Sequence, residues 1–154
     1  MTPEERLAEL GLDIPPPPPA AVPAYVPWVR TGSLVITSGQ LPWRDGVMAY
    51  SGRLGEDLTV EEGYEASRLA ALNGIAQLKD ALGELSRVVQ LVRLEGNVHT
   101  APGFHDHPHV LNGASELMIS VFGERGRHTR TALGIHDMPL DAAVQLSLYA
   151  EVGD

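Results

Sequence analysis

Five consecutive prolines at residues 15–19 constrain the fold of this chain more than any other feature of its sequence. Each proline fixes its φ angle and lacks a backbone N–H, so the run can form neither an α-helix nor a central β-strand. We expect an extended, stiff spacer, with a ligand for a proline-recognition domain as the alternative. The run therefore divides the chain into an N-terminal helix and proline-rich arm, residues 1–19, and a single domain, residues 20–154.

Residues 2–10, ahead of the prolines, predict a short helix. Thr2 is a suitable N-cap, Pro3 a suitable first residue and Gly11 a suitable stop. The same segment has no basic stretch followed by an apolar one, so it does not resemble a secretory signal. The sequence also has no run of about 18 apolar residues, the length needed to cross a bilayer. We therefore expect a cytoplasmic protein without a membrane partner.

The rest of the chain alternates between strands and two long amphipathic helices. The Thr59-x-x-Glu62 sequence is a capping box that begins one helix, which Gly83 ends. The second helix covers residues 108–122. The expected strands are residues 25–30 and 34–37, which form a hairpin, a short one after Gly46, and residues 87–96, 129–135 and 143–152. We expect the last two to pair antiparallel around the turn at residues 136–141. Both helices should pack on one face of a mixed sheet, which is an α+β architecture.

The charge balance and the residue types that are missing exclude several functions. The 154 residues include 11 lysines and arginines against 20 aspartates and glutamates, a net charge of −9. Such a chain repels polyanions, which weighs against a nucleic-acid partner. The absence of cysteine excludes disulfides and thiol catalysis. No glycine-rich phosphate loop of either common pattern is present, and we expect no cofactor.

Three histidines and an aspartate lie within residues 105–109 and raise the question of a metal site. Imidazole and carboxylate groups are common zinc ligands. Two ligands on one face of a helix need a spacing of four residues, which His105 and His109 have but His107 does not share. Because Pro108 marks the start of a helix, His105 falls in the preceding loop. We therefore expect a solvated helix N-terminus and no metal.

Residues 126–134, GRHTRTALG, gather positive charge at the start of a predicted strand of this acidic chain. An arginine on a rigid strand presents a planar fork that matches a carboxylate with two parallel hydrogen bonds. We expect Arg130 to bind a small anion, with a surface ion pair as the alternative. We interpret Arg127 as a solvated charge, and His128 as an interface or surface residue on the strand face opposite Arg130.

Several segments, in order along the chain, resemble the YjgF/RidA family of reactive-intermediate deaminases. They are SGQLP at residues 38–42, the helix ending in LKDALG, NGASELMISVFG at residues 112–123 and RHTRTALGIHDMPLDAAVQL at residues 127–146. The resemblance runs through residues 20–152, and the N-terminal helix and arm resemble a poorly characterised branch of the family. It implies a chorismate-mutase-like α+β fold in a homotrimer, with ligand clefts between subunits.

The resemblance also implies an activity, the hydrolysis of 2-imino or 2-enamino acids to 2-oxo acids and ammonia without a metal or organic cofactor. Arg130 matches the arginine that binds the substrate carboxylate, and Tyr25 matches a tyrosine at the cleft. Asn112 matches an asparagine near the cleft wall, and Ser38 and Gly39 match the segment that lines the pocket. We expect catalytic roles for Arg130 and Tyr25, and substrate-binding roles for the others.

Four further positions complete the site that the resemblance implies. Thr131 and Ala132 follow the arginine, and many relatives have a cysteine at the position of Ala132. Backbone groups around Leu133, or those of residues 98–101, are expected to orient a water molecule. Gln145 is the third expected catalytic residue, at a position where many deaminating members have a glutamate. An amide can hydrogen-bond the attacking water but cannot accept its proton, and general-base assistance contributes about two to four powers of ten in rate.

The glutamine leaves two other functions open. The first is a non-catalytic trimer that binds a small carboxylate metabolite through Arg130. The second is an endoribonuclease, because some family members are described as ribonucleases. The net charge of −9 and the lack of an evident acid–base pair weigh against it, although His128 and His99 are candidates for such a pair.

Overall fold

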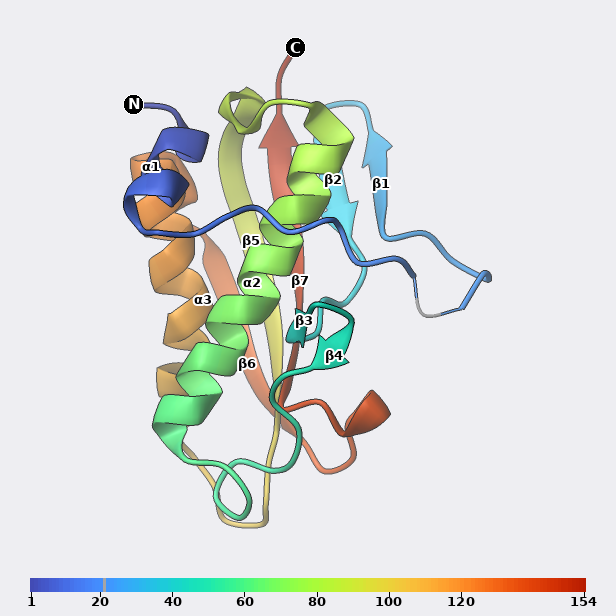
Figure 1. Ribbon diagram of the computed structural model, residues 1–154, viewed down its shortest axis with the longest axis vertical. Helices are drawn as coiled ribbons and strands as arrows, with labels where there is room; N and C mark the ends of the chain where they lie inside the picture. The colour runs from blue at the N-terminus through green and yellow to red at the C-terminus, as the bar shows by residue number, and fades with distance from the viewer. Residues whose placement is uncertain (21) are drawn as a thin grey trace.

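A five-stranded sheet with helices on one face forms the body of the computed structural model, which describes residues 1–20 and 22–154 (Figure 1). Its helices are α1 (Pro3–Glu9), α2 (Val60–Leu82) and α3 (His107–Phe122), with 3-10 turns η1 (Leu85–Arg87), η2 (Gly123–Gly126) and η3 (Pro139–Asp141). Its strands are β1 (Trp28–Thr31), β2 (Leu34–Thr37), β3 (Trp43–Arg44), β4 (Val47–Met48), β5 (Val88–His99), β6 (Thr129–Ile135) and β7 (Val144–Val152). Strands β3 and β4 form a separate ribbon.

The first two helices begin at the predicted caps. The Thr2 side chain accepts a hydrogen bond from the backbone N–H of the third helical residue, and Thr59 does the same at the start of α2. Gly83 ends α2 with a φ angle of 80°, which favours glycine. Helix α3 begins at His107, one residue before the predicted start, and ends at Phe122 as predicted. Within the described residues, no helix is long and apolar enough to cross a membrane.

The strands lie in the order β1-β2-β7-β5-β6. Strands β1 and β2 form the predicted antiparallel hairpin. The prediction that residues 129–135 and 143–152 pair with each other is wrong, because β5 lies between them. Strand β5 pairs parallel with β6 and antiparallel with β7. Helix α3 carries the chain back along the sheet, so β6 runs in the same direction as β5, and the loop 136–141 crosses the end of β5 instead of closing a hairpin.

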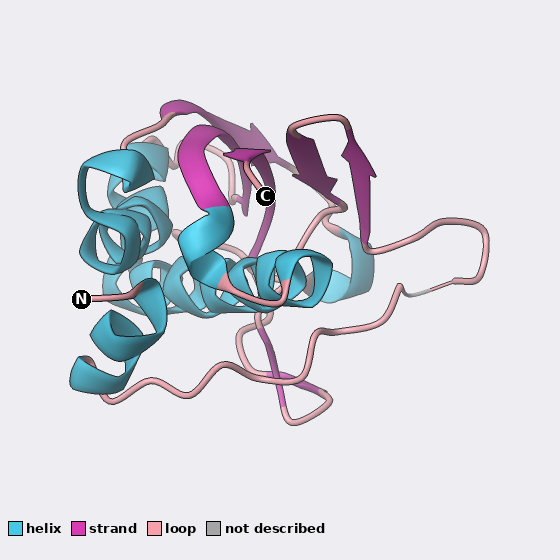
Figure 2. Cartoon of the chain, turned by 90° about the horizontal axis from the view of Figure 1, so that it is seen from above, coloured by secondary structure: helices cyan, strands magenta, loops and turns pink. Residues whose placement is uncertain are grey.

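Helices α2 and α3 cover one face of the sheet, and α1 packs against α3 (Figures 1 and 2). The core lies between these layers and includes Leu94 of β5 and Leu146 of β7, both fully buried. Alternate residues of the same strands, such as Gln145 and Tyr149, point to the opposite face and are only half-buried. The sheet thus has one covered face, and no helix of the described residues covers the other, which is the expected α+β architecture.

Helices α2 and α3 approach each other closely at Gly113. A Cβ at this position would collide with the α2 backbone and with the hydroxyl of Ser67. That hydroxyl donates a hydrogen bond to the backbone oxygen of Val110 (2.6 Å). The two helices are therefore held at short range, which fixes the position of Asn112 beside the edge of the sheet.

Candidate functional site

Arg130 lies on the edge strand β6, directly beside Leu94 of β5. Because Leu94 points into the core, Arg130 points to the same face, towards α3. Its Nη1 donates hydrogen bonds to Oδ1 of Asn112 (2.9 Å) and to Oγ of Ser115 (3.2 Å). The structure brings the predicted residues Arg130 and Asn112 together. Ser115 was not predicted, although its i, i+3 spacing from Asn112 puts both on one face of the helix.

Among the residues that the structure describes, the half-buried guanidinium of Arg130 contacts only the neutral side chains of Asn112 and Ser115. Within the part of the chain that the structure describes, its Nε and Nη2 make no hydrogen bond and no carboxylate forms an ion pair with it. An arginine whose charge is not compensated favours an anionic ligand. A carboxylate matches two free guanidinium nitrogens with two parallel hydrogen bonds. Arg130 is therefore not the surface ion pair that the sequence left as an alternative.

His128 does not point away from Arg130, so that prediction is wrong. Residues i and i+2 of an extended chain share a face, and both side chains contact Ser115. Nδ1 of His128 lies 2.6 Å from the carbonyl oxygen of Gly126, and Nε2 lies 2.9 Å from Oγ of Ser115. A carbonyl only accepts, so Nδ1 carries the proton and Nε2 accepts from the Ser115 hydroxyl. Burial lowers the pKa of His128, the hydrogen bond to Gly126 opposes this shift, and the charge of Arg130 adds to it.

A second group of predicted residues lies at the other edge of the sheet. Tyr25, Ser38 and Gly39 surround a small cavity of about 40 Å³. Ser38 follows β2, and its Oγ donates to the backbone oxygen of Val26 (2.6 Å), which holds the Tyr25 segment beside it. Pro18 and Pro19 of the proline-rich arm line the same cavity, together with Ala20, the first residue of the domain. The sequence did not predict this position of the arm, because no local pattern shows where an extended segment will pack.

Gln145 belongs to this second group. Its side chain packs over Gly39, where a Cβ would collide with it. Gln145 precedes the buried Leu146 on β7, so it points to the uncovered face of the sheet. Within one chain, Gln145 and Arg130 therefore point to opposite faces.

The three residues after Arg130 also divide between the two faces. Ala132 faces α3, as Arg130 does, and packs against the core. Thr131 and Leu133 alternate with them and point to the uncovered face, where Leu133 is 61% exposed. The side chains of residues 130–133 thus do not form one continuous pocket wall within a single chain.

The two groups of predicted residues cannot meet within one chain. Arg130 is on β6, whereas Ser38 follows β2, and β7 and β5 lie between these strands. Three strand spacings of about 4.8 Å separate the two positions by roughly 14 Å. Within a single chain, the two groups therefore lie apart on opposite sides of the sheet's central strands.

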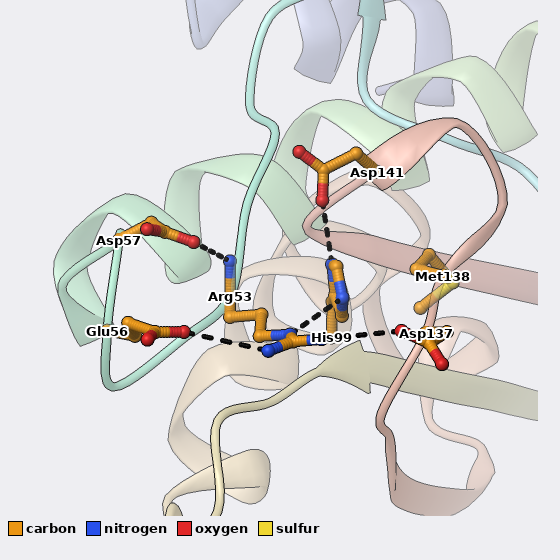
Figure 3. A pocket seen from close by; sticks show the side chains of 7 residues that line it. All are labelled: Arg53, Glu56, Asp57, His99, Asp137, Met138 and Asp141. Atoms are coloured by element: carbon orange, nitrogen blue, oxygen red, sulfur yellow. Dashed lines mark hydrogen bonds and ion pairs between the residues drawn. The ribbon is translucent and has the colours of Figure 1, made fainter.

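A third group of polar side chains surrounds a cavity of about 220 Å³ beyond the end of β5 (Figure 3). The lining residues are Arg53, Glu56, Asp57, His99, Asp137, Met138 and Asp141. Arg53 lies 3.3 Å from Asp137 and 3.7 Å from Glu56, so its charge is compensated. Since carboxylates outnumber the single guanidinium here, the cavity disfavours an anionic ligand. Sequence reasoning considered only His99 of this group, because the members come from the end of β5 and from separate loops without a shared motif.

His99 in this third group is buried, with 3% of its surface exposed. Its Nε2 is 3.1 Å from the backbone oxygen of His136, and its Nδ1 is 3.5 Å from Oδ1 of Asp141. His99 pairs with Ile135 at the far end of β6, whereas His128 precedes the first residue of that strand. Seven residues of extended chain separate the two imidazoles by roughly 20 Å. They do not form the acid–base pair that a ribonuclease would need within one chain.

The histidines of residues 105–109 do not converge. His105 lies in the loop before α3, the His107 ring packs edge-on against Phe104, and His109 contacts Asp106 (3.4 Å). In the described parts of the chain, no group of three histidine, aspartate or glutamate side chains is arranged to hold a metal ion.

Comparison with known proteins identifies the family. Residues 4–152 match the family described as "YjgF/chorismate mutase-like, putative endoribonuclease". The chain belongs to the YjgF/RidA family. The YjgF/RidA match begins within α1, so the N-terminal helix is part of the shared sequence. The family resemblance and the chorismate-mutase-like fold expected from the sequence are both confirmed.

Three relatives resemble the chain over almost its whole length. Protein TCP17 of Trypanosoma cruzi is 42% identical over 152 residues, which are 97% of this chain and 93% of TCP17. A solved structure from Shewanella oneidensis MR-1, described as a "putative endoribonuclease", is 47% identical, with a TM-score of 0.93 and coverage of 99% of this chain and 100% of that one. Atu1372 of Agrobacterium tumefaciens, a protein of unknown function, is 39% identical, with a TM-score of 0.92 and coverage of 98% and 92%.

A more distant structure, TdcF of E. coli with bound serine, has the same fold at 20% identity and a TM-score of 0.60. It covers 90% of this chain and 96% of its own.

Proposed function

We propose that this YjgF/RidA protein hydrolyses 2-imino and 2-enamino acids to 2-oxo acids and ammonia, in clefts between the subunits of a homotrimer. The observation that carries the proposal is the guanidinium of Arg130, whose charge is not compensated and whose Nε and Nη2 are free of partners among the described residues. A compact anion such as a carboxylate fits this arrangement. TdcF, a distant relative with bound serine, supports a small amino-acid-like ligand for the fold.

The separation of the two residue groups supports the cleft between copies. Arg130 and Asn112 would come from one subunit, and Tyr25, Ser38 and Gly39 from a second. Closed homo-oligomers repeat the same interface, so a trimer would contain three identical clefts. Each cleft would lie between the β6 edge of one subunit, which carries the Arg130 guanidinium, and the edge of a second subunit that carries the cavity of about 40 Å³.

In this cleft, Arg130 would hold the substrate carboxylate and so fix the position of the adjacent imine carbon. Asn112 and Ser115 orient the guanidinium, which leaves its other nitrogens for the ligand. Water attacks the electrophilic carbon, a C–O bond forms, the nitrogen takes up a proton and the C–N bond breaks to release ammonia. The reaction consumes one water molecule and needs no oxidant or reductant. The catalyst mainly supplies position and orientation.

Gln145 limits the proton transfer that the site can provide. Its amide can orient the attacking water by a hydrogen bond, but it cannot accept the proton that the water loses. We therefore expect a slower deaminase than one with a carboxylate at this position. The same residue favours the second candidate function, a trimer that binds a small carboxylate metabolite without turnover.

An endoribonuclease, the function in the descriptions of several relatives, has less support in this chain. The net charge of −9 repels an RNA backbone, and His99 and His128 lie at opposite ends of β6. Incubation with single-stranded RNA tests this function directly, and we expect no cleavage above that of a heat-denatured sample.

The deaminase is tested by competition for a freshly formed imine. An amino-acid oxidase acting on alanine generates 2-iminopropanoate, and semicarbazide traps it as a product that absorbs in the ultraviolet. We expect the protein to lower the rate of semicarbazone formation in proportion to its concentration, and denatured protein to have no effect. If no imino acid with a small or a large side chain responds, the deaminase proposal fails and the carboxylate-binding trimer replaces it.

A further inference from the structure

The hydroxyl of Ser115 on α3 lies between an imidazole and a guanidinium. Its Oγ is 2.9 Å from Nε2 of His128 and 3.2 Å from Nη1 of Arg130, and all three side chains are half-buried. A guanidinium only donates, so Arg130 occupies a lone pair of Oγ and the hydroxyl proton is directed at His128. A serine hydroxyl that donates to an imidazole nitrogen is the arrangement that activates a serine as a nucleophile.

A third group orients the imidazole. Nδ1 of His128 donates to the carbonyl oxygen of Gly126 (2.6 Å), so Nε2 has no proton and is turned towards Ser115. Gly126 is buried against α3, where a Cβ would collide with the backbone oxygen of Met118. The close packing of η2 on α3 therefore fixes the carbonyl, and the carbonyl fixes the ring that faces the serine. All of these contacts lie within a single chain.

The imidazole has its basic form at neutral pH. Burial lowers the pKa of His128, and the charge of Arg130 lowers it further, whereas the hydrogen bond to Gly126 raises it. The neighbouring charges of Glu124 and Arg127 form an ion pair with each other (3.2 Å). A neutral imidazole can accept the serine proton, and the adjacent guanidinium stabilises the negative charge that then develops on Oγ.

Hydrogen-bond donors for an oxyanion are available beside the serine. Asn112, one helical turn before Ser115, accepts from Arg130 through its Oδ1, and across residues 1–20 and 22–154 its Nδ2 makes no hydrogen bond. Nε and Nη2 of Arg130 are also free within these residues. Such N–H groups stabilise the negative oxygen of a tetrahedral intermediate. The cluster thus contains a nucleophile, a base, an orienting group and oxyanion donors, which are the parts that acyl transfer requires.

We propose that Ser115 is a nucleophile and that the protein hydrolyses small carboxylic esters at this cluster, an activity separate from imine hydrolysis. Oγ of Ser115 attacks the carbonyl carbon while its proton passes to Nε2 of His128. The carbonyl oxygen becomes negative beside Asn112 and Arg130. The bond to the alcohol oxygen then breaks, and His128 returns the proton to the leaving alkoxide. Water, which gives a proton to His128, hydrolyses the acyl-serine, and the carboxylic acid leaves as the Ser115 hydroxyl is restored.

Diisopropyl fluorophosphate tests the nucleophile, because it phosphorylates an activated serine and releases fluoride. Intact and peptide mass spectra of the wild type should show one adduct per chain, on Ser115. Ser115→Ala should prevent this adduct, and Ser120→Ala is the matched control, because Ser120 is an exposed serine of the same helix. His128→Gln removes the base and should slow labelling by about 100-fold or more. Circular dichroism confirms that each variant is folded.

Two further measurements complete the test. The labelling rate of the wild type should rise from pH 5 and become level above about pH 6.5, as His128 loses its proton, and this profile needs no variant. The wild type should release p-nitrophenol from p-nitrophenyl acetate about 100-fold or more faster than Ser115→Ala. The absence of an adduct on Ser115, equal labelling of folded His128→Gln, or a rate independent of pH between 5 and 7.5 overturns the proposal. Labelling of Ser115 without turnover of the ester overturns the hydrolase.

Discussion

Replacement of Arg130 by alanine should abolish most of the proposed activity. The substitution removes Nε and Nη2, the two guanidinium nitrogens that are free for a carboxylate. A hydrogen bond to a charged group contributes about 1.5–3 kcal/mol, so the loss of two costs at least about 3 kcal/mol of transition-state stabilisation. That corresponds to a roughly 100-fold lower kcat/KM. Arg130→Lys keeps the charge but loses the fork, and an intermediate loss of about tenfold is expected.

The semicarbazide competition assay measures this effect, with Arg53→Ala as the matched control. Arg53 is also a half-buried arginine, but Asp137 and Glu56 compensate its charge in a cavity that disfavours anions. Its loss should leave kcat/KM within about threefold of wild type. Thermal unfolding of all three variants separates loss of activity from loss of fold. Wild-type activity in folded Arg130→Ala, or an equal loss in Arg53→Ala, would refute the assignment of the carboxylate to Arg130.

Three further predictions concern pH, chemistry and packing. The pKa of His128 is lower in the folded protein than its ordinary value near 6.5, so its contribution to stability is complete above about pH 6.5 and is lost as the pH falls through the folded value. His128→Gln should therefore unfold at a midpoint temperature that depends less on pH between 7.5 and 5 than that of wild type, and an equal dependence contradicts the shift. Gln145→Glu supplies a general base and should raise kcat by about tenfold or more at pH 7.5; an unchanged kcat removes Gln145 from the chemistry. Gly113→Ala crowds the contact between α2 and α3 and should lower the free energy of unfolding by about 1–3 kcal/mol in a urea titration, whereas a stability equal to wild type shows that the helices move apart without cost.

The helices could be predicted from the sequence because their signals are local. Thr2 followed by Pro3 predicted the start of α1, Thr59 followed by Glu62 three residues later predicted the start of α2, and Gly83 predicted its end. The pairing of β6 was not predictable in the same way. The short loop 136–141 is compatible with a hairpin, and only the packing of α3 on the sheet decides that β5 separates β6 from β7.

The candidate site shows the same limit. The strand position of Arg130 was predicted, but which side chains α3 presents to it, the neutral Asn112 and Ser115, depends on the tertiary packing. The sequence was sufficient to predict the face of His128, because residues i and i+2 of an extended chain share a face. The prediction that it points away from Arg130 misapplied this rule. The contact of Pro18 with Gln77 joins residues 59 positions apart in the sequence, and no pattern in either segment indicates it.

Subunit complementation tests the central claim, a cleft formed by Arg130 of one copy and Tyr25 of another. Arg130→Ala and Tyr25→Ala chains carry different tags and are co-expressed in equal amounts, and the mixed oligomers are purified through both tags. Each pure variant should be inactive in the imine assay. Each mixed trimer holds two chains of one variant and one of the other, so one of its three clefts combines an intact Arg130 with an intact Tyr25, and activity should return to about a third of that of wild type. Mixed oligomers as inactive as either pure variant would contradict a shared cleft.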